Sequence, residues 1–277
     1  MERLIVADGT VISYHKYGSG PALVLVHGGF SDHVTNWEFI KPTLQDRFTI
    51  YAIARRGRGE TDATAGHTIE DEGNDVAALI NAIGEPVFLL GHSYGGQCAL
   101  AAALIVPDRI RKLVVYEAPW PGALKREDVA RLEELAAAHK WDELAVTFFR
   151  DMLFVPAEEV EAVRSSPLWP PIVGDAEASL GDLRAVSRYR FDAGRWRGLD
   201  IPVLLQIGSE SHHHLYVTDA LASVLPNAHV QALAGQAHEG MTTAPEMYAE
   251  AITRFLLEDA RETVAAGGVS SGAVRGD

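Results

Sequence analysis

One stretch of this sequence constrains the fold more than any other: residues 86–106, PVFLLGHSYGGQCALAAALIV. Its short apolar run, 87–90, has the length and composition of a strand buried on both faces, and its alanine-rich second half predicts a helix. Between the two lies a sharp turn at Ser93, where Gly91 and Gly95 leave room for strand and helix to approach each other. A serine on such a turn projects its hydroxyl above the sheet, so Ser93 is a candidate nucleophile.

Strands and helices alternate on both sides of this turn. Asp8-Gly9 predicts a hairpin over residues 2–17. Apolar runs predict strands at 22–26, 48–54, 112–116, 203–207 and 229–233. Helices are expected at 36–44, 68–83, 217–225 and 245–259, and Thr68 with Asp71 forms a capping box at the start of the second. This alternation predicts an α/β fold with a mostly parallel central sheet and helices on both faces.

The alternation stops between residues 120 and 197, where the sequence reads as several helices broken by prolines. An insertion of this kind between two strands would form a helical cap over the carboxyl ends of the strands, where ligands bind in this architecture. We therefore expect a core of residues 1–119 and 198–259 with a cap of residues 120–197. Residues 260–277 are poor in large apolar side chains and are expected to be a disordered tail.

The composition excludes some classes of partner and site. A formal net charge of −14 argues against binding to nucleic acid or to an anionic membrane. The single cysteine, Cys98, rules out an internal disulfide and is expected to be a small buried side chain. The first residues lack the apolar core of a signal peptide, and no run approaches the length of a membrane span, so the sequence predicts a cytoplasmic protein. The oligomeric state stays open.

Taken together, these features resemble the α/β-hydrolase family, from the hairpin to about Leu257. The matching motifs are the His27-Gly28-Gly29 turn, the RRGRGET loop at 55–61, the GHSYGG turn at 91–96, the helical insertion and the late histidine of GQAHEG, His238. The resemblance implies the α/β-hydrolase fold and a serine hydrolase that needs no cofactor.

The same resemblance supplies partners for the serine. A serine hydroxyl is a weak nucleophile at neutral pH and needs a base, which a histidine provides. His238 follows the last strand, where the family carries this base. The oxyanion of the tetrahedral intermediate needs two backbone N–H donors, and the family position assigns them to Gly29 and Tyr94. The N–H of Phe30 is a near alternative to that of Gly29.

The acid that orients the histidine departs from the common pattern. Many family members carry an aspartate three residues beyond the glycine that ends the next-to-last strand, and here that position is Ser211. Glu210 lies one position early. Glu117 follows the preceding strand in a Glu-x-Pro setting, which resembles the zearalenone-lactonase type of the family. We expect Glu117 to be the acid and keep Glu210 as the alternative.

The implied activity is hydrolysis of a carboxylic ester or lactone through an acyl-enzyme. Cleavage of an amide, a thioester or a carbon–carbon bond stays open, because the same residues serve all three. The substrate is expected to be a small apolar or aromatic molecule, since the predicted pocket is rich in aromatic side chains: Phe30, Trp120, Phe148, Phe149 and Trp169. The alternative is a non-hydrolytic member of the fold, either a ligand-binding module or a lyase or oxygenase that uses the same pocket.

Two further motifs are given structural interpretations. His212, His213 and His214 are consecutive, so their side chains diverge, and no metal site is expected there. The three arginines of the 55–61 loop are expected to form internal ion pairs, with Glu60 and Asp62 as the nearest acids.

Overall fold

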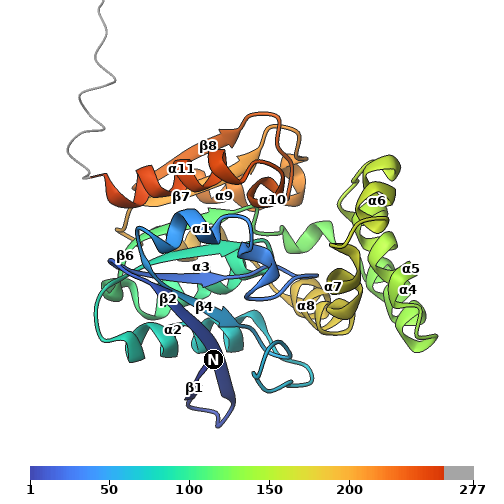
Figure 1. Cartoon of the computed structure of the whole chain (residues 1–277), viewed down its shortest axis with the longest axis horizontal. Coiled ribbons are helices and arrows are strands. Elements are labelled where there is room, and N and C mark those ends of the chain that lie inside the picture. The colour runs from blue at the N-terminus through green and yellow to red at the C-terminus, as the bar shows by residue number, and fades with distance from the viewer. Residues whose placement is uncertain (259–277) are drawn as a thin grey trace, which may run out of the picture.

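A single eight-stranded sheet forms the centre of the molecule in the computed structural model, which describes residues 1–258 (Figure 1). The strand order is β1-β2-β4-β3-β5-β6-β7-β8. The strands are β1 (Glu2–Ile5), β2 (Val11–Gly18), β3 (Ala22–Val26), β4 (Thr49–Ala54), β5 (Val87–His92), β6 (Ile110–Tyr116), β7 (Val203–Gly208) and β8 (Ala228–Leu233). Within the described residues, two pairs of neighbouring strands are antiparallel, β1 with β2 and β2 with β4. All the other neighbouring strands run parallel. The predicted hairpin and the mostly parallel sheet are confirmed.

Helices cover both faces of this sheet (Figure 1). In chain order they are α1 (Lys41–Gln45), α2 (Ile69–Ile83), α3 (Tyr94–Ile105), α4 (Arg126–Ala137), α5 (Trp141–Thr147), α6 (Ala157–Arg164), α7 (Trp169–Gly174), α8 (Ala176–Arg188), α9 (Thr218–Ala222), α10 (Gly240–Thr243) and α11 (Pro245–Leu257). Residues 259–277 lie outside the described part of the chain, and with them the predicted tail. No helix among residues 1–258 has the length and apolarity needed to cross a membrane.

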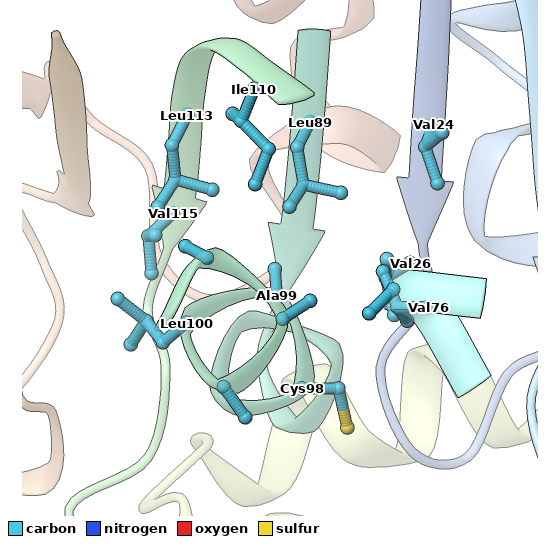
Figure 2. Packing of buried hydrophobic residues seen from close by; sticks show 14 of the residues in the cluster. Val24, Val26, Val76, Leu89, Cys98, Ala99, Leu100, Ile110, Leu113 and Val115 are labelled. Atoms are coloured by element: carbon cyan, nitrogen blue, oxygen red, sulfur yellow. The ribbon is translucent and has the colours of Figure 1, made fainter. Parts of the chain in front are cut away.

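The strands bury side chains on both faces. In β3, Val24 and Val26 belong to the core under α2 and α3, whereas Leu23 and Leu25 belong to the core under α1 and α11. This alternation explains why the central strands are apolar at every position. Figure 2 shows the first of these cores, in which α3 packs on β3, β5 and β6, and Cys98 is buried there as expected.

Two local predictions have different outcomes. The capping box of α2 is present, with the Thr68 side chain accepting from the N–H of Asp71 and the Asp71 carboxylate accepting from the N–H of Thr68. The single helix expected over 36–44 is wrong. The chain forms a 3₁₀ turn, η1 (Thr35–Trp37), and only then α1. Pro42 explains the break, because its ring cannot follow a preceding helical turn but fits the first turn of a new helix.

The residues between β6 and β7 form the helices α4 to α8, which gather at one side of the sheet (Figure 1). We call residues 120–197 the insertion. Its helices enclose an apolar cluster of their own that includes Leu132, Leu144, Trp169 and Leu180, and the core contributes Phe30 to it. Between α5 and α6 the chain makes a short π-helix, η4 (Phe148–Met152), which the sequence did not reveal.

Candidate active site

Ser93 lies on a strained turn between β5 and α3. Its φ of 52° falls in the left-handed region, which costs a serine free energy and is maintained only by the surrounding structure. The N–H of Ser93 donates to the carbonyl of Tyr116 at 2.8 Å, and the N–H of Gly96 donates to the carbonyl of Ser93 at 2.8 Å. The backbone on both sides of the serine is therefore fixed.

The glycines that flank Ser93 are required because neighbouring backbone atoms leave no room for a Cβ atom at either position. A Cβ atom on Gly95 would overlap the backbone carbonyls of Val26 and His27 at the end of β3. A Cβ atom on Gly91 would lie 2.5 Å from the carbonyl oxygen of Gly95. Larger residues would push α3 away from the sheet, which confirms the sequence-based reason for both glycines.

His238 and Glu117 meet beside this turn. Nδ1 of His238 lies 2.7 Å from Oε2 of Glu117, while Oε1 of Glu117 accepts from the N–H of Gly208 at 2.7 Å. Glu117 follows β6 directly and its side chain is fully buried. Glu210, the alternative acid, is exposed and its carboxylate accepts from the hydroxyl of Ser209. The structure thus brings Glu117, and not Glu210, to the histidine.

The two partners shift each other's pKa. Burial alone would raise the pKa of Glu117, yet the hydrogen bond and charge of His238, the hydroxyl of Ser211 and the N–H of Gly208 leave it below its usual value. Burial alone would lower the pKa of His238, yet the hydrogen bond and charge of Glu117, with a further contribution from Glu239, raise it above 6.5. The arrangement favours a carboxylate beside an imidazole that accepts a proton readily.

Tyr216 stacks on the other side of the imidazole. The rings of Tyr216 and His238 are 5.5 Å apart and inclined by only 10°, and the phenol oxygen lies 3.3 Å from Nδ1. Backbone hydrogen bonds tie residues 118–120 to residues 215–217, from Val217 N to Ala118 O and from Trp120 N to Leu215 O. Sequence reasoning missed Tyr216, because nothing near it in the chain links it to the segment after Glu117.

The N–H groups of the turn after β3 have different partners. Gly28 donates to Oδ1 of Asn36 at 2.7 Å, and Phe30 donates to Oγ of Ser179 at 2.6 Å. Within residues 1–258 no acceptor takes the N–H of Gly29. Of the two candidates for the first oxyanion donor, Gly29 is therefore the one whose N–H is left for a ligand.

A hollow of about 770 Å³, its open mouth included, lies over Ser93 and His238. Its walls include Gly29, Phe30, Tyr94, Trp120, Phe148, Phe149, Leu215 and Tyr216. Most of the aromatic residues expected here do line it. Trp169 does not, because it packs inside the insertion and donates its indole N–H to Asp142 at 2.7 Å.

A group of buried charges joins the insertion to the core beside this hollow. We call it the ionic cluster: Arg55, Arg58, His67, Glu72, Asp175 and Asp182. Asp182 of α8 binds both arginines, at 2.6 and 2.7 Å, and Arg55 also donates to the carbonyls of His27 and Gly28. The cluster thereby holds the turn that carries Gly29.

Internal ion pairs for the arginines of the 55–61 loop are confirmed, but their expected partners are wrong. Glu60 pairs instead with Arg3 at the surface, and Asp62 accepts from the N–H of Val11. Arg56 pairs with Asp75 and with Asp8. Residues this far apart in the chain could not be matched from the sequence.

Three other groups of histidines and acids lie outside the ion pairs of the 55–61 loop or overlap them. His213 pairs with Asp219 at 3.1 Å, and the rings of His212 and His214 lie against Phe154. His67, Glu72 and Asp182 are close enough together to bind a metal, but Arg55 and Arg58 already bind these carboxylates and would repel a cation. A third group, His92, His238 and Glu239, belongs to the active site itself.

Comparison with known proteins assigns the chain to a family. The model of the alpha/beta hydrolase family matches residues 23–251. The chain belongs to this family. It is 29% identical over 274 residues to a putative carbamate hydrolase RutD of Caulobacter sp. (strain K31), covering 91% of this chain and 99% of that protein. It is 27% identical over 259 residues to 2-(acetamidomethylene)succinate hydrolase of Mesorhizobium japonicum, covering 88% of this chain and 91% of that one.

Solved structures agree with the family assignment. An alpha/beta hydrolase from Sphaerobacter thermophilus DSM 20745 has a TM-score of 0.79 and 29% identity, over 92% of this chain and 100% of that one. An enol-lactonase from Burkholderia xenovorans LB400 has a TM-score of 0.78 over 93% and 100%, and at 20% identity it supports the fold alone. The chain is a hydrolase of the alpha/beta hydrolase family.

Proposed function

We propose that this protein is a cofactor-free serine hydrolase that cleaves a carboxylic ester or lactone through an acyl-enzyme intermediate. One observation carries the proposal: His238, from a buried carboxylate–imidazole pair with Glu117, lines the same hollow as a serine held on a strained turn. This is the combination that nucleophilic catalysis by serine requires.

In the proposed mechanism, Ser93 attacks the carbonyl carbon of the ester while His238 takes the hydroxyl proton. Glu117 accepts the Nδ1–H of His238 and stabilises the imidazolium. The N–H groups of Gly29 and Tyr94 stabilise the oxyanion, a contribution of about 3 kcal/mol for one donor in comparable sites. His238 then gives the proton to the leaving alcohol, and a water molecule releases the acid from Ser93 by the same steps.

The walls of the hollow support an apolar or aromatic substrate. Phe30 stacks on Phe148 with ring centres 4.5 Å apart, and Phe149 and Trp120 add further aromatic surface. Such walls exclude water and favour substrates that bury apolar area.

The test is covalent labelling with a fluorophosphonate, which reacts with activated serines. We expect one adduct, on Ser93, identified by peptide mass spectrometry, and none in the Ser93→Ala variant. Ser209→Ala, a matched change outside the hollow, should label like the unchanged protein. Absence of an adduct on Ser93, together with tight binding of an ester that is not turned over, would favour a non-hydrolytic ligand-binding protein instead.

A further inference from the structure

Glu239 is a second acid in the active site, next to the histidine but not used by the proposed mechanism. It lines the hollow together with Ser93 and His238. One of its carboxylate oxygens lies within 4.8 Å of a ring nitrogen of His238 and of one of His92. The group is therefore close to where an ester would react.

The carboxylate of Glu239 has no partner of its own. Among the described residues, only its backbone carbonyl takes part in hydrogen bonds, from Thr242 and Thr243. Burial raises the pKa of Glu239, as expected of a carboxyl that the protein leaves without a cation. Glu239 is only partly buried, so its unpaired carboxylate faces the hollow, where an entering cation can pair with it.

Asp182 is a second acid of the same hollow, and unlike Glu239 it has basic partners. It also lines the wall, but Arg55 and Arg58 both bind it. No lysine or arginine is among the residues that line the hollow, so none is placed to neutralise Glu239 from within.

A bound metal ion is the other candidate partner, and the geometry disfavours it. Nε2 of His92 lies 3.0 Å from the carbonyl of His238, and its Nδ1 lies 3.2 Å from Oδ1 of Asn36. A metal at this place would have to displace one of these hydrogen bonds and would occupy His238 itself. An organic cation could instead pair with the Glu239 carboxylate from within the hollow, without displacing any of these hydrogen bonds.

Aromatic rings complete the chemistry of a cation site. Phe30, Trp120, Phe148, Phe149 and Tyr216 line the hollow, and the faces of such rings attract cations. The net charge of −14 adds a field that draws cations to the protein. A substrate with a carboxylate would meet the unpaired carboxylate of Glu239, with no lysine or arginine on this wall to bind it, and would be disfavoured.

We propose that the hollow selects esters that carry an ammonium group, with Glu239 as the counter-ion. The inference rests on the proposed esterase function and names the substrate class of that site. The cation would lie between the Glu239 carboxylate and the aromatic wall, while the ester carbonyl lies over Ser93.

Two substrates of nearly the same shape test the proposal: butyrylcholine and its uncharged analogue 3,3-dimethylbutyl butyrate. We expect kcat/KM to be about tenfold higher for the cationic ester, mainly through a lower KM. Glu239→Gln should remove this preference. Glu210→Gln removes the same charge from an exposed loop and should keep it. Equal kcat/KM for the two esters in the unchanged protein, or an unchanged ratio in Glu239→Gln, would overturn the proposal.

A second measurement does not depend on turnover. Tetraethylammonium should slow the labelling of Ser93 by a neutral fluorophosphonate in the unchanged protein and in Glu210→Gln, but not in Glu239→Gln. If Ser93 is labelled and the neutral ester is hydrolysed, yet no cation effect is found, the cation site fails while the esterase stands. If Ser93 is not labelled at all, the proposed function itself fails.

Discussion

The ionic cluster and the active-site group around His238 bury charges in opposite ways. In the ionic cluster each acid has a basic partner, and Asp182 is shared by two arginines at 2.6 and 2.7 Å. Around His238, Glu117 is paired but Glu239 is not. The ionic cluster thus pairs its charges within the protein, whereas the active site leaves the carboxylate of Glu239 unpaired and open to a ligand.

Charged side chains therefore have two roles in this molecule: some hold the structure together, and one is left to interact with a ligand. Fully paired charges fix the position of neighbouring backbone, here the turn with Gly29, and removing one partner leaves the others unsatisfied. An acid without an internal partner adds little to stability but interacts with whatever enters the hollow. The following experiments test this contrast.

The largest effect should come from breaking the carboxylate–imidazole pair. Glu117→Gln keeps the shape of the side chain but removes the charge that orients and supports the imidazolium, so kcat for a p-nitrophenyl ester should fall by roughly 10⁴-fold. Glu210→Gln, its matched control, should change kcat by less than about twofold. Equal activity of Glu117→Gln and the unchanged protein would contradict the assigned acid.

Next in size is the loss of a partner in the ionic cluster. Asp182→Asn leaves Arg55 and Arg58 without their shared carboxylate, and the free energy of unfolding should fall by about 3–5 kcal/mol. Urea unfolding followed by circular dichroism measures it. Glu133→Gln breaks a surface pair with Arg184 and should cost less than about 1 kcal/mol. An equal loss in free energy of unfolding for the two variants would show that the ionic cluster stabilises the fold no more than a surface ion pair.

His67 gives the ionic cluster a dependence on pH. Burial alone would lower its pKa, but the carboxylates of Asp182 and Glu72, at 3.5 and 3.1 Å from its Nε2, raise it to about 10. Because the folded pKa lies above the unfolded value, the stabilisation is complete below pH 6.5 and disappears as the pH rises to 10. We expect the free energy of unfolding to fall by about 2 kcal/mol over this window, solvent screening included. His67→Gln should flatten the curve, and a loss as steep as in the unchanged protein would refute this role.

The smallest effect concerns the pH dependence of catalysis. His238 must be neutral to accept the serine proton, and its pKa is raised, so kcat/KM should fall toward acid with a midpoint above pH 6.5. Glu239→Gln removes one of the two carboxylates that raise this pKa, and the midpoint should move down by less than about one pH unit. Glu210→Gln should leave it in place. An upward movement in Glu239→Gln would mean that Glu239 does not act on His238 as a negative charge.

Much of the fold could be read from the sequence, because its signals are local. Apolar runs such as 87–90 and the capping box of Thr68 and Asp71 depend on residues a few positions apart. The turn at Ser93 is predictable for the same reason, since it needs glycine on both sides. Glu117 was chosen over Glu210 from its Glu-x-Pro setting, and the structure places it 2.7 Å from His238.

What the sequence did not reveal depends on distant contacts. The hydrogen bond from Phe30 to Ser179 joins residues 149 positions apart, and Asp182 meets Arg55 across 127 positions. The aromatic character of Trp169 predicts a place in the substrate wall, but aromatic residues also fill the interior of the insertion, and Trp169 lies there. No local pattern tells these two uses apart.

The pairing of residues 118–120 with residues 215–217 has a consequence for protein engineering. The chain leaves the sheet through this pairing, just after Glu117, so the segment of the acid and the segment of Tyr216 share one anchor. Replacing residues 121–197 by the corresponding helices of a relative should change which esters fit without moving the reacting groups, provided the transplant retains counterparts of Ser179 and Asp182. The insertion could thus be exchanged to vary the aromatic wall of the hollow, while Ser93, His238, Glu117 and Glu239 stay in the core.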